Sequence, residues 1–206
     1  MSQQSRHDAW SAGDSYDLYM GRWSRLTAAR FLDWVDPPPG LDWLEIGCGT
    51  GALAGTIVAR CAPASLTGVE PSETFLEQAR ASLGATARLL PGDAQALPVP
   101  DHAHDIVVSG LVLNFVPDRA LALAEMRRAV RPGGTVAFYV WDYPSGGLEF
   151  VHAFWSVATS LDPAAADLAE DRRFPFCTAE ALARPRRGGR PRGRRLRRAR
   201  GPDSLS

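Results

Sequence analysis

Short apolar runs alternate along the chain with longer segments whose apolar positions recur at helical spacing. The apolar runs that predict strands are residues 41–46, 66–70, 87–90, 105–109 and 135–141. The segments that predict helices are residues 27–35, 52–61, 73–82, 118–130 and 149–160. Because the strand runs are almost continuously apolar, both faces of the predicted sheet are buried. The pattern predicts an α/β fold with a doubly wound, mostly parallel sheet.

Proline and glycine mark several of the predicted boundaries. Residues 37–40 (PPPG) follow the first helix, and Pro132-Gly133-Gly134 is expected to end the helix over 118–130. In parallel sheets, ligands bind at the carboxyl ends of the strands. We therefore look for function in the loops after these runs.

The first of these loops carries three glycines at alternate positions, Gly47, Gly49 and Gly51. Glycine lets the chain turn sharply and brings bare backbone against a ligand, and the following helix adds free N–H groups and a positive dipole end. The alternative is a tight turn without a ligand. The GxGxG spacing, preceded by Glu45, differs from the GxGxxG of dinucleotide sites.

An acid, Glu70, ends the next predicted strand. A carboxylate there can accept hydrogen bonds from two ribose hydroxyls, although alone it could be a solvated charge. Its place about twenty residues after the glycines favours the ribose interpretation.

Four motifs in order resemble a known family. EIGCGTG at 45–51, GVEPS at 68–72, PGDAQALPVPDHAHDIVVSG at 91–110 and MRRAVRPGGTVAFYVWD at 126–142 resemble class I S-adenosylmethionine-dependent methyltransferases. The likeness is to the small-molecule branch that includes the ubiquinone and menaquinone biosynthesis methyltransferases, and it extends over roughly residues 14–180. It implies a Rossmann-like sheet and S-adenosyl-L-methionine as cofactor.

The resemblance also implies which residues bind the cofactor. The glycine loop would lie under its methionine part, Glu70 and Pro71 at the ribose and adenine edge, and Ser109 beside the sulfonium. Asp93 would accept from the adenine N6 amine, and the Ala94 N–H would donate to a ring nitrogen. Tyr16 and Arg22 would close the site, although both fit ordinary helix-surface packing. The full set is Tyr16, Arg22, Glu45, Gly47, Cys48, Gly49, Gly51, Glu70, Pro71, Asp93, Ala94 and Ser109.

The predicted function is methyl transfer to a small-molecule acceptor by in-line displacement. We assign no catalytic base: His102 and His104 are expected in a solvated loop, and a structural role is favoured for Asp142, Tyr143 and His152. Alternatives are a truncated, non-catalytic cofactor-binding remnant, a nicotinamide-dependent oxidoreductase, and a nucleic-acid binder with an arginine tail. The acceptor and the oligomeric state are left open.

Charge changes the picture of the last residues. The formal net charge is zero, but ten of the 23 basic residues, all arginines, fall in residues 184–206 beside one acid. The tail therefore carries +9 and residues 1–183 carry −9. We favour a changed reading frame or truncation near residues 182–184 over a solvated tail, and both over nucleic-acid binding. On this interpretation the sheet lacks its last two strands.

The predicted organisation has three parts: a helical cap over the cofactor site (residues 1–36), the cofactor-binding domain (37–183) and a disordered, arginine-rich tail (184–206). No apolar run approaches the ~20 residues of a membrane span, and the first residues lack a signal-peptide pattern, so we expect a cytoplasmic protein. The three cysteines form no CxxC pair, and the four histidines show no metal-binding spacing.

Overall fold

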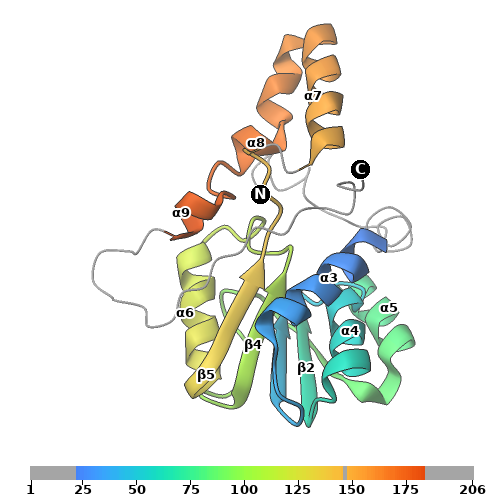
Figure 1. Ribbon diagram of the computed structural model, residues 1–206, viewed down its shortest axis with the longest axis vertical. Helices are drawn as coiled ribbons and strands as arrows, with labels where there is room; N and C mark the ends of the chain where they lie inside the picture. Colours follow the sequence, from blue (N-terminus) through green and yellow to red (C-terminus); the bar gives the residue numbers. More distant parts are fainter. Residues whose placement is uncertain (1–21, 146–147, 184–206) are drawn as a thin grey trace. The chain divides into compact units, whose positions relative to one another are not determined.

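Five parallel strands form a single sheet in the computed structural model, which describes residues 22–145 and 148–183 (Figure 1). The order across the sheet is β3-β2-β1-β4-β5. Their bounds are β1 (Asp42–Ile46), β2 (Ser65–Glu70), β3 (Arg88–Pro91), β4 (His104–Gly110) and β5 (Val130–Tyr139). The predicted α/β class and parallel sheet are confirmed. Residues 1–21 and the arginine-rich tail lie outside the described residues.

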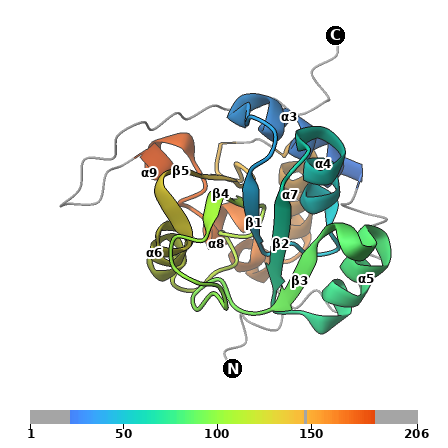
Figure 2. The ribbon, with the colours of Figure 1, turned by 90° about the horizontal axis from the view of Figure 1, so that it is seen from below.

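Four helices pack on this sheet: α3 (Arg22–Val35), α4 (Ala52–Cys61), α5 (Glu73–Leu83) and α6 (Arg119–Ala129). Helices α3, α4 and α5 share one core with the sheet, in which Trp43 of β1 and Ile57 of α4 are fully buried. Helix α6 lies on the opposite side of the sheet from α4 (Figure 2) and buries Met126 completely. Both faces of the sheet are therefore covered, as the apolar runs predict.

The strand order reverses direction between β1 and β4, which are hydrogen-bonded neighbours. Their register pairs Ile46 with Ser109, so the loops after these two strands begin side by side. Because the chain leaves β1 toward one face and β4 toward the other, a crevice opens at this point in folds of this kind. The topology places the glycine loop there.

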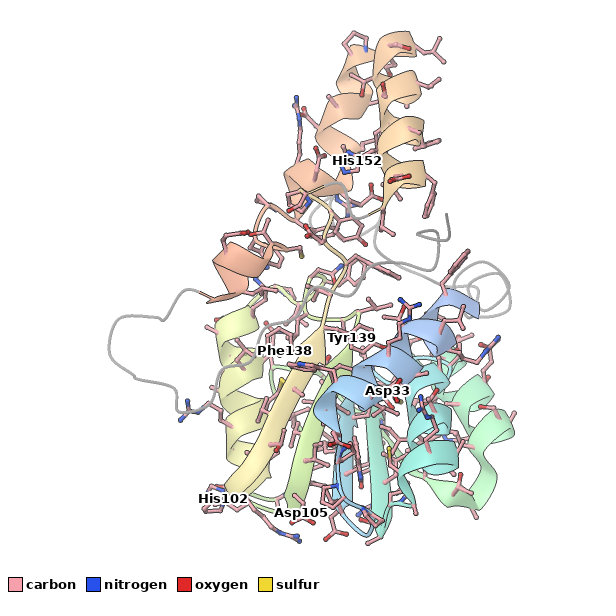
Figure 3. All side chains as sticks on the ribbon, in the orientation of Figure 1. Asp33, His102, Asp105, Phe138, Tyr139 and His152 are labelled. Carbon is pink, nitrogen blue, oxygen red and sulfur yellow. The ribbon has the colours of Figure 1, made fainter. Side chains whose placement is uncertain are left out.

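The opposite, amino edge of the sheet is held by an ion network. Arg131 contacts Asp105 at 2.6 Å and Asp42 at 3.0 Å, and the Asp42 N–H donates to Asp105 at 2.9 Å. Ser65 donates to Asp42 at 2.7 Å. The pKa of Asp42 is lowered mainly by the hydrogen bond from Ser65 and secondarily by Arg131. The pKa of Asp105 is lowered mainly by the hydrogen bond from the Asp42 N–H and secondarily by Arg131. Figure 3 shows Asp105 at this edge.

The predicted bounds of the helix over 118–130 and of the last strand are wrong. Helix α6 ends at Ala129, and β5 begins at Val130 instead of Thr135 and ends at Tyr139 instead of Trp141. The register passes from His104 opposite Val130 to Ile106 opposite Thr135. The chain therefore pairs with β4 both before and after the Pro-Gly-Gly turn, and the residue before the turn, Arg131, bonds to Asp105 and Asp42.

The prediction that His104 lies in a solvated loop is also wrong. His104 is the first residue of β4 and is buried, and within the described residues its Nδ1 has no hydrogen-bond partner. Burial lowers the pKa of its imidazole. Its neighbour His102 is exposed, as expected, and its Nδ1 lies 2.9 Å from the Val130 carbonyl oxygen (Figure 3).

A second compact unit begins at Val140. It contains α7 (Glu149–Leu161), the 3-10 helix η3 (Pro163–Leu168), α8 (Glu170–Arg173) and α9 (Ala179–Ala183). Tyr143, Phe174 and Cys177 form its small core, and the Trp155 indole N–H donates to Glu170. Across the residues that the structure describes, no helix combines the length and apolar character needed to cross a membrane.

Candidate functional site

The glycine loop depends on positive φ angles that other residues rarely adopt. Gly47, Gly49 and Gly51 have φ of 68°, 52° and 90°. A Cβ on Gly47 would come within 2.4 Å of the Val112 side chain, which packs against the loop from the segment after β4. At Gly49, by contrast, no described atom lies within 4 Å of the position that a Cβ would take. The loop therefore needs glycine at 47 for packing and presents open space at 49.

Glu70 joins this loop to the next one. One carboxylate oxygen accepts from the Gly49 N–H and the other from the Ser72 N–H, both at 3.0 Å. Burial raises the pKa of Glu70, and these two hydrogen bonds oppose that effect. Each carboxylate oxygen can accept more than one hydrogen bond, so Glu70 keeps capacity for two hydroxyl donors.

Glu45 is the more unusual acid, because it is only 2% exposed and one of its oxygens, Oε2, has no hydrogen-bond partner within the described residues. Burial, and secondarily the charge of Glu70, raise its pKa well above the usual range. A buried carboxylate with an unpaired oxygen is costly, and an adjacent cation or donor would remove that cost. Glu45 and Glu70 thus form a pair of buried acids whose ionised forms a positively charged ligand would stabilise.

Asp93 lies in the loop after β3 with its carboxylate held in place. Its Oδ1 accepts from the Gln95 backbone N–H at 2.7 Å and from the Gln95 side chain at 3.1 Å. Asp93 is exposed, whereas the next residue, Ala94, is buried. Pro71, after β2, is also exposed. A fixed, exposed carboxylate is available to accept a hydrogen bond from a ligand.

Two predicted residues have side chains engaged in the fold. The Ser109 hydroxyl is fully buried and donates to the Ile46 carbonyl at 3.0 Å, which ties β4 to β1. The Cys48 thiol is buried, and burial raises its pKa, so it stays protonated. Tyr16 lies outside the described residues. Arg22 begins α3, but its side chain lies outside the described part. Their cofactor roles stay predictions.

Asn114 is a polar residue of this edge that the sequence interpretation missed. It is only 3% exposed, and within the described residues neither carboxamide atom has a hydrogen-bond partner. It follows Leu111, a non-glycine residue with φ of 61°, and Val112, which packs against Gly47. The signal was available: Asn114 is the single amide in the apolar run 111–116 (LVLNFV).

Two of the residues considered as bases, Asp142 and His152, have structural partners. His152 Nε2 lies 2.8 Å from the Tyr143 carbonyl oxygen, and Asp142 accepts from the Ser145 N–H at 3.1 Å. Figure 3 shows His152 on α7. Within the described ranges, no group of three His, Cys, Asp or Glu side chains could hold a metal ion. No residue of the described chain is assigned as a catalytic base.

A parallel sheet with a glycine loop after β1 and an acid at the end of β2 defines a Rossmann-like domain for a ribose-containing cofactor. Comparison with known proteins narrows this class. Residues 44–138 match the family described as methyltransferase domain. The sheet unit is thus a class I S-adenosylmethionine-dependent methyltransferase domain, as the motifs predict, and S-adenosylmethionine is the cofactor of that class.

Three similar proteins illustrate the assignment. The malonyl-[acyl-carrier protein] O-methyltransferase of Pseudescherichia vulneris is 35% identical over 160 residues, which cover 78% of this chain and 61% of that one. The demethylmenaquinone methyltransferase of Staphylococcus aureus is 36% identical over 100 residues, covering 47% and 42%. A solved S-adenosylmethionine-dependent methyltransferase from Thermotoga maritima has a TM-score of 0.51 and 29% identity, covering 63% and 56%. The chain spans about half the length of the curated relatives it matches.

Proposed function

We propose that this protein transfers the methyl group of S-adenosylmethionine to a small-molecule acceptor by in-line displacement. The observation that carries the proposal is the pair of buried acids at the ends of adjacent strands, Glu45 and Glu70, on either side of an open glycine loop. Both acids have raised pKa values because burial disfavours their charged forms. A ligand that brings positive charge and hydroxyl donors satisfies both.

The donor set fits this cofactor better than a dinucleotide. Glu45 would face the cationic methionine end, Glu70 the ribose hydroxyls, and Asp93 with the Ala94 N–H the adenine. A nicotinamide dinucleotide instead places its anionic pyrophosphate against the glycine loop. Glu45 in its ionised form would repel a pyrophosphate bound at that loop, and its Oε2 has no partner within the described residues, so the oxidoreductase alternative is disfavoured.

The chain's contribution to the reaction is mainly positional. S-adenosylmethionine supplies an activated methyl group, whose carbon–sulfur bond breaks as the bond to the acceptor forms and leaves a neutral thioether. The loops after β1, β2 and β3 hold the donor, and the apolar segment 111–116 after β4 helps to exclude water. An acceptor that is already deprotonated needs no base, and a neutral hydroxyl acceptor loses its proton to solvent.

The acceptor class is a small molecule. Relatives at similar identity are named for malonyl-[acyl-carrier protein] and demethylmenaquinone, so these compounds belong in an acceptor panel. Release of S-adenosylhomocysteine with each panel member measures turnover. Cofactor binding without turnover on any member would support the alternative of a non-catalytic remnant. Salt-dependent DNA binding that disappears on deletion of residues 184–206 would instead support the nucleic-acid alternative.

The cofactor site can be tested before the acceptor is known. Isothermal titration calorimetry of the full chain should show binding of S-adenosylmethionine and S-adenosylhomocysteine, and none of NAD. Glu70→Gln should weaken binding by about tenfold or more, because hydrogen bonds to charged groups contribute about 1.5–3 kcal/mol. Glu77→Gln, at an exposed position of α5, is the matched control and should bind normally. Equal affinity of the wild type and Glu70→Gln would contradict the proposal.

A further inference from the structure

The segment that connects β3 to β4 is a long loop without regular structure. Residues 92–103 contain only turns and one isolated bridge between Asp93 and Ala96. Loops of this length usually need side-chain contacts to keep one conformation. This loop carries Asp93 and Ala94, so whatever fixes the loop also fixes the edge proposed to recognise adenine.

Two side chains of α6 hold the loop. Arg128 donates to the Leu97 carbonyl at 3.0 Å, the Val99 carbonyl at 2.8 Å and the Asp101 carboxylate at 2.6 Å. Glu125 accepts from the Leu97 N–H at 2.9 Å. Leu97, itself buried, is therefore held by α6 at both its N–H and its carbonyl group.

The two α6 side chains also hold each other. Arg128 Nε and Nη2 donate to the two oxygens of Glu125 at 2.8 and 2.7 Å, in a bidentate pair. The side chains are 28% and 17% exposed, so water screens the pair only partly. Arginine suits this position because its planar fork offers five donors in fixed directions, which the single ammonium of a lysine cannot do.

The amino end of the same helix reaches the loop closer to Asp93. The backbone N–H of Asp118, the N-cap of α6, donates to the Gln95 side chain at 2.9 Å. Gln95 in turn donates to the Asp93 carboxylate from both its backbone and its side chain. Helix α6 thus contacts the loop at two points, Gln95 and the stretch 97–101, and Figure 2 shows the loop after β3 passing to α6.

We propose that Glu125 and Arg128 are positioning residues that set the preference for a 6-aminopurine over a 6-oxopurine in the cofactor. This proposal rests on the proposed function, in which Asp93 accepts from the 6-amino group and the Ala94 N–H donates to N1. In a 6-oxopurine both hydrogen-bonding groups are reversed. Its O6 is an acceptor facing the Asp93 carboxylate, which also accepts, and its N1–H is a donor facing the Ala94 N–H, which also donates. Rejection of that base depends on the loop keeping both groups in place.

The test is the ratio of two dissociation constants measured by calorimetry on the full chain, for S-adenosylhomocysteine and S-inosylhomocysteine. The wild type should strongly prefer the adenosine compound. Arg128→Met should lower the preference by about tenfold or more, because a loosened loop loses the hydrogen bonds that favour adenine and the mismatch that rejects hypoxanthine. Arg128→Lys should lower the ratio as much as Arg128→Met does, because the several donors of the guanidinium group, and not its charge alone, hold the loop.

Arg127→Met is the matched control, an exposed arginine of the same helix, and should leave the ratio unchanged. If Arg128→Met does not fold, Glu125→Gln provides the milder variant with the same expected direction. A purely structural role would weaken both compounds equally, and an unchanged ratio would overturn the proposal. Failure of the wild type to bind S-adenosylhomocysteine would instead contradict the proposed function itself, and the positioning role with it.

Discussion

The two edges of the one sheet treat their polar groups in opposite ways. At the amino edge, Asp42 and Asp105 are paired with Arg131, and their pKa values are lowered by donors within the fold. At the carboxyl edge, Glu45 and Glu70 are buried with raised pKa values, and Glu45 Oε2 has no partner within the described residues. The acids of the amino edge thus have partners within the fold, whereas at the carboxyl edge the described residues leave Glu45 Oε2 without a donor.

The difference between the two edges shows that the destabilising polar groups, the buried acids Glu45 and Glu70, lie at the carboxyl edge of the sheet. Polar groups buried without partners are destabilising, and they persist where function needs them. His104 is the exception on the other side, because it is buried at the amino edge with its Nδ1 unpaired within the described residues. Four substitutions test whether the contrast between the edges is real.

Gly47→Ala should have the largest effect. The new Cβ meets Val112 at 2.4 Å, and the residue must keep φ of 68°, so we expect a loss of about 2–4 kcal/mol in the free energy of unfolding and loss of cofactor binding. Gly40→Ala is the control, with φ of 78° but no described atom within 4 Å of its Cβ, and should cost about 1 kcal/mol. Chemical denaturation measures both. Equal losses would show that Val112 does not restrict position 47.

Glu45→Gln should weaken cofactor binding by about 1.5–3 kcal/mol and yet raise the melting temperature of the free protein at pH 8. Because the folded-state pKa of Glu45 is raised, its contribution to the free energy of unfolding is fully present below the usual glutamate pKa of about 4.3. That contribution is lost as pH rises through the folded-state pKa. Glutamine does not titrate, so the gain should vanish near pH 4. Thermal melts across pH measure it, and a variant less stable than wild type at pH 8 would contradict the assignment.

Arg131→Met should destabilise the protein only modestly at pH 7, because solvent screens its exposed ion pairs with Asp42 and Asp105, and should leave cofactor affinity unchanged. Because the pKa values of Asp42 and Asp105 are lowered, their contribution is full above the usual aspartate pKa of about 3.9 and is lost as pH falls through the folded-state values. The difference from wild type should therefore shrink in acid. Arg127→Met is the control, and a change in cofactor affinity would show that the edges are coupled.

Ser65→Ala should have the smallest effect, about 0.5 kcal/mol or less, because Ser65 is exposed. The hydrogen bond from Ser65 is the main cause of the lowered pKa of Asp42, so that pKa should rise in the variant. Nuclear magnetic resonance titration of the Asp42 carboxyl measures it. An unmoved pKa would assign the effect to Arg131 alone.

The sequence predicted the strand and helix order well because each buried strand is a short apolar run between clear turn residues. It also placed Glu45, the three glycines and Glu70 at one edge, since carboxyl ends of parallel strands meet there. It misplaced the start of β5, because the pairing of Val130 with His104 on the far side of Pro132–Gly134 is a long-range contact that the local Pro-Gly-Gly pattern does not indicate. The contacts of Arg128 were missed for the same reason, as long-range hydrogen bonds leave no local pattern. Asn114 was missed although a local signal existed, since it is the single amide in the apolar run 111–116.

The raised pKa values of Glu45 and Glu70 have a thermodynamic consequence for ligand uptake. A cation that enters beside Glu45 favours its ionised form, so cofactor binding at a pH near the folded-state pKa of Glu45 should release protons to the buffer. The heat measured by calorimetry would then include the ionisation enthalpy of the buffer and differ between phosphate and Tris at the same pH. The slope of that dependence counts the protons released by the carboxyl edge.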